Sequence, residues 1–392
     1  MDRLNDIQRY TMQLFDYCRR NDWAGYDPYD ALNSRVFAST PFSKSKVCRI
    51  AFTQILKRVP INLRPILAIT KEQNPKAIAL FLMASLKLSR LGLLENQEII
   101  TSLAESLTEL RSPDSTYWCW GYSFPWQTRT VLVPRGAPNL VCTVFVANAL
   151  LNLYEWGRES RFLGMAISAA EYILNELYWS EGNTACFSYP LASSRARVHN
   201  ANFLGAALLC RVHKLSSEKK FLDPAMKVAR YSTSRQHEDG GWNYGELPTQ
   251  RWIDNFHTGY NLCALRSICR DAGTTEFESH IRSGFEFFKK NFFRQDGAPG
   301  YFHNRLYPID IHSVAQSIIT LLELADLNRG NIDLAKSVFS WAMQNMWDEH
   351  GYFHYQKFPY FTSKVSYMRW SQAWMFLALS SLLVGFSQHI PS

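Results

Sequence analysis

Six segments of the chain carry apolar or small residues at almost every position and are rich in Ala and Leu. Their successive starts lie 65, 61, 57, 55 and 56 residues apart. A helix that is apolar nearly all round is a buried helix, and a near-constant period indicates an internal structural repeat. The segments begin at Asn74, Asn139, Asn200, His257, His312 and Met368.

Amphipathic segments alternate with these buried ones, each with an apolar stripe and a charged face; examples span residues 161–179, 219–236, 280–295 and 332–347. Each repeat is therefore predicted to be an outer helix, a loop and an inner helix. One such hairpin cannot bury both faces of its inner helix, but six hairpins closed in a ring can. We expect an all-α (α/α)6 toroid of six helical hairpins. No Pro-, Gly- or Ser-rich linker interrupts it, so residues 1–392 are predicted to form one toroid domain with an N-terminal arm of about residues 1–45.

The loops between outer and inner helices also repeat. Each contains aromatic and Gly residues followed by a polar stretch, as in the segments that begin at Trp118, Asn183, Asp239, Gly297 and His350. Such segments are typical of short β-hairpins or extended arms. Because they connect the same ends of the helices, we expect them to gather on one face of the ring, and long loops with their own order are usually functional.

The helical repeat and its loops together resemble those of known proteins. The helix alternation, the period near 56 residues and the DGGW-type loop resemble (α/α)6 toroid proteins of carbohydrate metabolism, including uronate epimerases, polysaccharide lyases and N-acylglucosamine 2-epimerases. Three segments more closely resemble uncharacterised toroid proteins encoded in bacterial polysaccharide-biosynthesis loci: NDWAGYDPYDALNSR at Asn21, DGGWNYGE at Asp239 and WIDNFHTGY at Trp252. The resemblance implies a carbohydrate-active enzyme of polysaccharide biosynthesis or processing, associated with other enzymes of that system.

Composition narrows the choice of partner. Aromatic residues make up 14% of the chain, and the formal net charge is +8. A positive excess favours an anionic partner, but the basic residues are scattered and no nucleic-acid-binding motif is present. An acidic oligo- or polysaccharide fits better, because aromatic rings also stack on sugars.

The same composition bears on location. The eight cysteines make no CxxC pair, which is typical of buried thiols in a cytoplasmic protein. The N-terminus has no apolar leader, and the longest apolar run, residues 373–386, is short for a membrane span. We therefore expect a cytoplasmic protein without a membrane span.

Candidate site residues lie where the inner helices begin. Helix N-termini favour anions, so several that converge on one cleft suit a carboxylate. The candidates at these helix starts are His199, Asn200, Asp254, Asn255, His257, Tyr260, Asp310, His312, Arg369 and Trp370. Those in the loop arms are Trp126, Arg129, Trp242, Glu246, Arg251, His303 and Tyr307. Ordinary structural roles compete: an Asp before a helix is usually an N-cap, a lone His is often only hydrogen-bonded, and for Trp242 the role of a loop anchor is slightly favoured over that of a sugar-stacking platform.

The favoured chemistry is proton abstraction beside the carboxylate of a uronate. It needs a base, an acid and a group that neutralises the carboxylate. His257 or His312 is the expected base, with His199 as a third histidine at an equivalent position, and Tyr260 or Tyr307 is the expected acid. The expected carboxylate clamp consists of Arg251, Arg369 and Asn255.

Three alternatives remain open from the sequence. A glycoside hydrolase would use two carboxylates from Glu246, Asp254 and Asp310. A sugar 2-epimerase would use two histidines as opposed bases. A non-catalytic protein would bind or scaffold a glycan. No metal or cofactor is expected, since HEDGGW at His237 lacks the HExxH spacing and no GxGxxG or Walker loop occurs.

Overall fold

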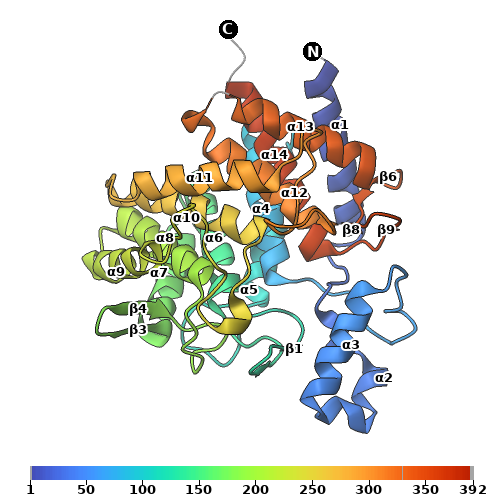
Figure 1. The fold of residues 1–392 in the computed structure, drawn as a ribbon, viewed down its shortest axis with the longest axis horizontal. Helices are drawn as coiled ribbons and strands as arrows, with labels where there is room; N and C mark the ends of the chain where they lie inside the picture. Colours follow the sequence, from blue (N-terminus) through green and yellow to red (C-terminus); the bar gives the residue numbers. More distant parts are fainter. Residues whose placement is uncertain (1, 329, 389–392) are drawn as a thin grey trace.

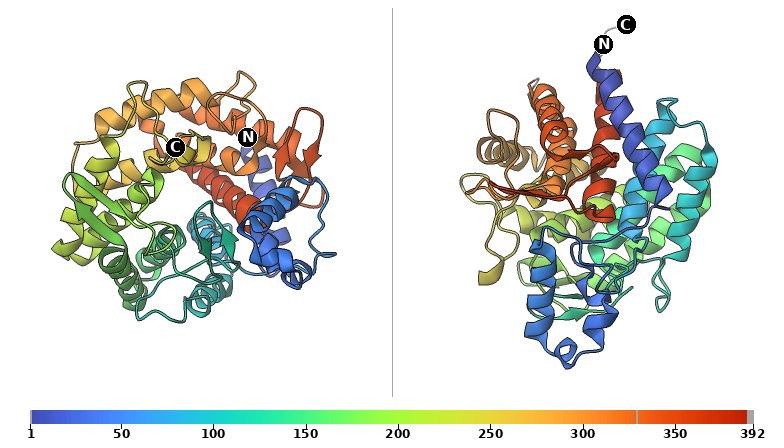
Figure 2. Two further views of the ribbon diagram at one scale, coloured as in Figure 1. Left: turned by 60° about the horizontal axis from the view of Figure 1, so that its bottom comes forward. Right: turned by 90° about the vertical axis from the view of Figure 1, so that its right-hand side faces the viewer.

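The inner helices form a closed ring, in which each packs against the next and α14 packs against α4 (Figures 1 and 2). The structure is a computed structural model that describes residues 2–328 and 330–388. The inner helices are α4 (Pro75–Arg90), α6 (Leu140–Gly157), α8 (His199–Ser216), α10 (Asn255–Ala272), α12 (Ile311–Glu323) and α14 (Ala373–Gln388), the last entered through the π-helix η7 (Met368–Gln372). The expected (α/α)6 toroid is confirmed.

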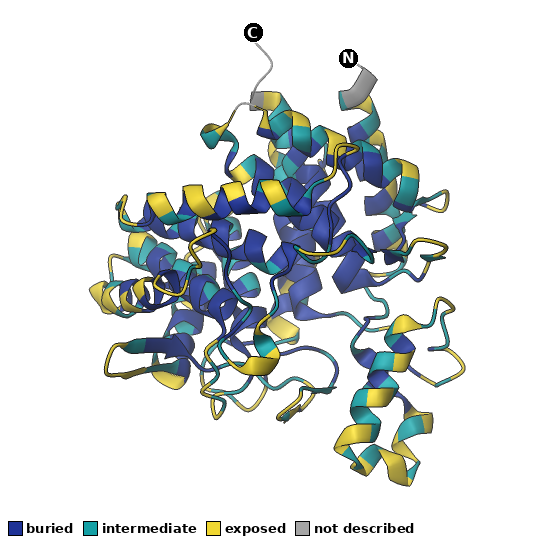
Figure 3. Ribbon diagram, in the orientation of Figure 1, coloured by how far each residue is buried: buried dark blue, intermediate teal, exposed yellow. Residues whose placement is uncertain are grey.

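The outer helices surround this ring. They are α1 (Asp2–Arg20), α5 (Gln97–Glu109), α7 (Ser160–Tyr172) with its π-helical extension η3 (Ile173–Leu177), α9 (Leu222–Thr233), α11 (Glu278–Phe292) and α13 (Asn331–Met346). Each inner helix packs on the outer helix that follows it, and α14 packs on α1, so the first helix completes the last pair. Burial follows this layering, because the inner helices are mostly buried whereas α11 shows alternating exposed and buried faces (Figure 3).

Two helical segments, 140–157 and 368–387, are long and apolar enough to cross a membrane by composition. Both are inner-ring segments here, and 61% and 72% of their respective windows are buried. The requirement for a buried, all-apolar surface inside the ring accounts for their hydropathy. All eight cysteines are free thiols, and six of them are buried.

The predicted arm segments that begin at Asp239 and Gly297 make only isolated bridges, whereas the other arms contain short antiparallel strand pairs. They are β1 (Trp126–Gln127) with β2 (Leu132–Val133), β3 (Tyr178–Glu181) with β4 (Thr184–Phe187), and β6 (Trp347–Asp348) with β7 (Tyr352–Phe353). A three-stranded sheet has the order β5 (Ile309–Asp310), β8 (Gln356–Lys357) and β9 (Thr362–Ser363). The last sheet joins the arm before α12 to the arm before α14, so adjacent arms support each other.

Residues 21–74 leave the ring between α1 and α4. They contain η1 (Asp30–Asn33), α2 (Arg35–Ala38), η2 (Pro41–Lys44) and α3 (Lys46–Arg58), which project from the ring in Figure 1. A small core of Ala31, Leu56 and Ile69 holds this lobe together. The expected N-terminal arm ended near residue 45, whereas the excursion begins after α1 and runs to residue 74.

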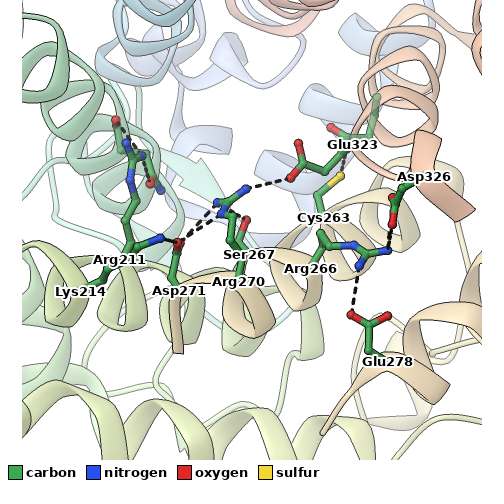
Figure 4. Close-up of polar contacts among 12 residues, drawn as sticks. Arg211, Lys214, Cys263, Arg266, Ser267, Arg270, Asp271, Glu278, Glu323 and Asp326 are labelled. Atoms are coloured by element: carbon green, nitrogen blue, oxygen red, sulfur yellow. Dashed lines mark hydrogen bonds and ion pairs between the residues drawn. The ribbon is translucent and has the colours of Figure 1, made fainter. Parts of the chain in front are cut away.

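At the C-terminal ends of the inner helices, ionic contacts link one helix to the next (Figure 4). Arg211 of α8 contacts Asn148, Asn152 and Glu155 of α6. Lys214 of α8 pairs with Asp271 of α10, and Arg270 of α10 pairs with Glu323 of α12. These contacts connect four consecutive inner helices at the end of the ring opposite their N-termini.

Candidate active site

A cleft of about 510 Å³ opens where the inner helices begin. The second residue of every inner helix lines it, counting η7 as the start of the sixth: Lys76, Val141, Asn200, Phe256, His312 and Arg369. Loop residues complete the walls, namely Tyr29, Tyr122, Phe124, Trp126, Arg129, Tyr189, Tyr244, Trp252, Asp254, Tyr301, Phe302 and Arg305. All six hairpins therefore contribute to one cleft, as the convergence of the helix N-termini predicts.

Asp254 and His257 form a hydrogen-bonded pair on the cleft wall. Asp254 is the N-cap of α10, where its Oδ1 accepts the backbone N–H of His257 at 2.9 Å. Its Oδ2 accepts a hydrogen bond from His257 Nδ1 at 2.7 Å and another from Trp252 Nε1 at 3.0 Å. The His257 side chain is 20% exposed, and its Nε2 has no hydrogen-bond partner in the part of the chain that the structure describes. This is the arrangement of a base held by a carboxylate, with one nitrogen free for a proton.

Tyr260 and His312 form a second pair across the α10–α12 boundary. The Tyr260 hydroxyl and His312 Nε2 share a hydrogen bond of 2.6 Å, and both residues are buried. Burial raises the pKa of Tyr260 well above its ordinary value, and burial lowers the pKa of His312 well below its ordinary value. Both groups are therefore neutral near pH 7. A neutral phenol backed by a neutral imidazole can deliver or receive one proton.

Aromatic rings form much of the cleft surface. Tyr244 stacks on Trp252, with ring centroids 4.6 Å apart and planes within 11°. Trp370 meets His312 edge-on at 4.5 Å, and Phe256 and Trp374 each stack on His312 at 4.6 Å. These contacts fix the plane of the His312 ring. The remaining exposed ring faces suit stacking on a sugar.

Positive charge predominates over negative charge in the cleft. Arg369 is buried and bound through two hydrogen bonds, of 2.6 and 2.8 Å, to Asp27, whose negative charge holds the pKa of the guanidinium above its ordinary value despite burial. Lys76 is buried at the start of α4. Arg129 and Arg305 are exposed at the mouth. Asp254 is the sole carboxylate among the described residues that line the cleft.

The sequence predicted nine of these cleft residues: Trp126, Arg129, Asn200, Asp254, His257, Tyr260, His312, Arg369 and Trp370. The other eight predicted site residues lie outside the cleft lining: His199, Trp242, Glu246, Arg251, Asn255, His303, Tyr307 and Asp310. The three histidines at the starts of inner helices therefore do not share one surface.

His199 and Trp242 lie behind the cleft, against α9. His199 Nδ1 lies 3.4 Å from Ser232 Oγ, and burial lowers the pKa of His199 to about 4. Trp242 Nε1 donates to the Ser232 carbonyl at 3.1 Å, and its ring meets Phe203 edge-on. Trp242 thus anchors the DGGW loop to the ring.

The other predicted residues outside the cleft also have structural partners or face solvent. Glu246 pairs with Arg197 at 3.0 Å, Asn255 donates to Ser317 at 3.1 Å, and Arg251 is exposed. His303 Nδ1 lies 3.2 Å from the Ile253 carbonyl, and Tyr307 is half-buried. The expected clamp of Arg251, Arg369 and Asn255 is not brought together.

Asp310 is an N-cap with a buried carboxylate. Its Oδ1 accepts the His312 amide and Trp370 Nε1, both at 2.9 Å, and its Oδ2 accepts from Gln356 Nε2 at 2.6 Å. Burial raises the pKa of Asp310 to about 6. It positions two residues that line the cleft without lining it itself.

Sequence reasoning missed Lys76 and most of the aromatic wall. A local signal for Lys76 was available, because PKAIALFLMASL places a lysine two residues after the Asn74 cap in an otherwise apolar helix. Counting each inner helix from its cap would have aligned Lys76 with His312 and Arg369. The loop aromatics carry no comparable signal, since equally aromatic loop residues such as Trp242 are buried anchors.

A metal site has no support in the described residues. No group of three or more His, Cys, Asp or Glu side chains in residues 2–328 and 330–388 is arranged to hold a metal ion.

The ring of six helix pairs, with a cleft at the inner N-termini, defines an (α/α)6 toroid protein. No family model matches the chain, and no curated protein matches it. Solved structures do. A GH76 α-mannanase from Bacteroides thetaiotaomicron is 11% identical, with a TM-score of 0.61 over 83% of this chain and 90% of that chain.

Two further solved structures share the fold. Cellobiose 2-epimerase from Spirochaeta thermophila is 13% identical, with a TM-score of 0.59 over 81% of this chain and 87% of that chain. A polysaccharide lyase is 11% identical, with a TM-score of 0.56 over 81% of this chain and 92% of that chain. The three proteins are carbohydrate-active enzymes that catalyse three different reactions. The likeness therefore establishes the fold of this chain, and its reaction has to be inferred from the residues of the cleft.

Proposed function

We propose that this protein is a carbohydrate-active enzyme that abstracts a proton from an acidic, uronate-containing glycan, in lyase- or epimerase-type chemistry. The observation that carries the proposal is the Asp254–His257 pair, which presents a free imidazole nitrogen to an aromatic cleft. A part in polysaccharide biosynthesis or processing and a cytoplasmic location belong to the same proposal.

In this mechanism His257 Nε2 takes the proton from the carbon beside the substrate carboxylate. Asp254 holds the ring through Nδ1 and stabilises the imidazolium that forms. Tyr260, hydrogen-bonded to His312, supplies a proton to the opposite ring face in an epimerase or to the leaving oxygen in a lyase. Cleft cations neutralise the carboxylate, which makes the neighbouring C–H bond more acidic.

A glycoside hydrolase is the weaker alternative. Its usual mechanism needs two carboxyl groups about 5–10 Å apart across the scissile bond. Of the three carboxylates expected for that role, Glu246 pairs with Arg197 and Asp310 is buried behind His312 and Trp370, which leaves Asp254 alone in the described cleft lining. A non-catalytic glycan-binding protein would leave the Asp254–His257 arrangement without a use.

The test is incubation with uronate-containing polysaccharides in heavy water, followed by proton NMR and by absorbance of unsaturated uronate ends. Deuterium at C5 or new unsaturated ends is expected from wild type and not from His257→Gln. His350→Gln is the matched control, because His350 also pairs with an aspartate, Asp348, but lies outside the cleft. Glycan binding without exchange or cleavage across the panel would overturn the proposed chemistry and favour a binding protein.

A further inference from the structure

Lys76 is a buried lysine without a carboxylate partner. It is the second residue of α4 and is 3% exposed. Its Nζ lies 4.1 Å from the ring centroid of Phe145, 5.2 Å from that of Trp374 and 5.5 Å from that of Tyr260. We call these three rings the lysine cage. Within the described residues, no Asp or Glu lies within ion-pair distance of Lys76.

The groups around Lys76 do not supply the missing negative charge. Arg369 repels it from η7, and Asp27, whose charge favours the protonated lysine, is already bound to Arg369. Cys142 of α6 is a buried thiol, and burial raises its pKa to about 12. Tyr260 of α10 and His312 of α12 are neutral, as argued above.

An ammonium group in this position is costly in the empty cleft. Burial lowers the pKa of Lys76 well below its ordinary value, and Arg369 lowers it further. The lysine cage opposes this effect, because ring faces attract a cation within about 6 Å. An anion placed against Nζ would provide the counter-charge that the protein leaves out.

Besides Trp126 Nε1, two further buried polar atoms in the same cleft have no hydrogen-bond partner among the described residues. They are Asn200 Oδ1 and His312 Nδ1, on residues that are 3% and 1% exposed. Both residues line the cleft at the same helical position as Lys76. Buried polar atoms of this kind are normally satisfied, so the three groups together mark where a polar ligand binds.

We propose that Lys76 is the counter-ion of the substrate carboxylate and that it takes up a proton from solvent when an acidic sugar binds. The inference rests on the proposed function for the identity of the cleft, but it concerns binding and not turnover. It replaces the clamp expected from Arg251 and Asn255, which lie elsewhere. Lys76 shares the cleft lining with Tyr260 and His312, so a carboxylate against Nζ lies beside the proposed acid.

The experiment is calorimetric titration of the protein with D-glucuronate and with D-glucose, from pH 6 to pH 9, in buffers of different ionisation enthalpy. Wild type should bind glucuronate more tightly and should take up as much as about one proton per sugar. Lys76→Met should lose about tenfold or more in glucuronate affinity, the scale of a charge-assisted hydrogen bond, together with the proton uptake. Glucose affinity should stay unchanged.

Lys57→Met is the matched control. Lys57 Nζ lies 4.3 Å from the Tyr29 ring centroid and 5.7 Å from that of Trp370, near the cleft but outside its lining. This variant makes the same substitution at a lysine beside the cleft and should keep both the preference for glucuronate and the proton uptake. Equal loss in both variants would overturn the proposal, since it would show a general effect of charge.

Lys76→Arg adds a second readout, because arginine stays protonated and should bind glucuronate without proton uptake. If neither Lys76 variant folds, the buffer dependence of the wild-type binding enthalpy decides alone: no uptake with glucuronate overturns the proposal. Deuterium incorporation that depends on His257 but occurs only in a neutral sugar would also overturn the proposal for Lys76. It would leave the assignment of His257 as a proton-abstracting base intact. Glucuronate binding through Lys76 without exchange would support this inference and refute the proposed function.

Discussion

Asp254 holds both the backbone and the side chain of His257, with Oδ1 on the amide N–H and Oδ2 on Nδ1. One carboxylate therefore caps α10 and orients the proposed base. Asp254→Asn separates these roles, because Asn caps a helix about as well as Asp but carries no charge. We expect kcat to fall by about 10²–10⁴-fold, while the midpoint of thermal unfolding stays close to that of wild type.

Asp310→Asn is the comparison for this prediction. Asp310 caps α12 in the same way, but its carboxylate contacts Trp370 and Gln356 rather than a histidine side chain. Its loss in kcat should be much smaller than that of Asp254→Asn. Equal losses in steady-state kinetics of the two variants would show that the caps matter only structurally.

Burial of His199 should make stability depend on pH. Because its pKa is about 4 in the folded protein and about 6.5 when unfolded, the unfolded chain binds the proton first as pH falls. The contribution of neutral His199 is complete above about pH 6.5 and is lost between about pH 6.5 and 4, at about 1.4 kcal/mol per pH unit. The difference in free energy of unfolding between wild type and His199→Gln should shrink over that window, measured by urea unfolding.

Asp310 provides a control of opposite sign. Its folded pKa is raised to about 6, so the folded protein binds the proton first and the burial penalty of the carboxylate is relieved as pH falls below about 6. Wild type should therefore gain stability relative to Asp310→Asn in the range where it loses stability relative to His199→Gln. Parallel trends in both variants would contradict the assignment to these two groups.

The fold followed from local patterns, and the site only partly did. Counting η7 as the start of the sixth, the inner helices start within two residues of the predicted positions, because their apolar character and the Asn or Asp caps of four of them are encoded in adjacent residues. The orientation of a side chain depends on its count from the cap. His199 is the first residue of α8, His312 the second of α12 and His257 the third of α10. Each additional residue turns the side-chain direction by about 100° around the helix axis, so His312 and His257 reach the cleft and His199 does not.

Residue roles that depend on contacts between segments far apart in the chain could not be predicted from the sequence. Arg369 was expected to contact substrate, but Asp27, 342 residues away in the chain, occupies its guanidinium. Lys76 is the converse case, since its isolation from carboxylates depends on which residues the ring closure brings near it. Neither situation leaves a pattern in adjacent residues.

The Asp27–Arg369 pair should stabilise the junction between the N-terminal excursion and α14. Asp27→Asn leaves a buried guanidinium without its counter-ion, which costs about 3–5 kcal/mol when such a pair is broken. The double variant Asp27→Asn with Arg369→Met removes both charges and should cost less than the single one. At the exposed Arg9–Asp6 pair, Asp6→Asn should cost no more than about 1 kcal/mol. Urea unfolding measures all three, and a double variant that is less stable than Asp27→Asn would contradict the argument.

Gly240 in the DGGW loop has a φ of +93°, and a Cβ there would lie 2.3 Å from the Ser283 carbonyl oxygen of α11. Gly240→Ala therefore combines backbone strain with a steric clash against the backbone of α11. That helix packs on α10, so it cannot move away without disturbing the ring. Gly92 has a φ of +69° with open space around it, so Gly92→Ala isolates the strain, at about 1 kcal/mol. We expect Gly240→Ala to lower the free energy of unfolding by clearly more than Gly92→Ala does. If the two variants lose equal stability in urea unfolding, the close approach of the loop to α11 contributes nothing, and the glycine serves the turn alone.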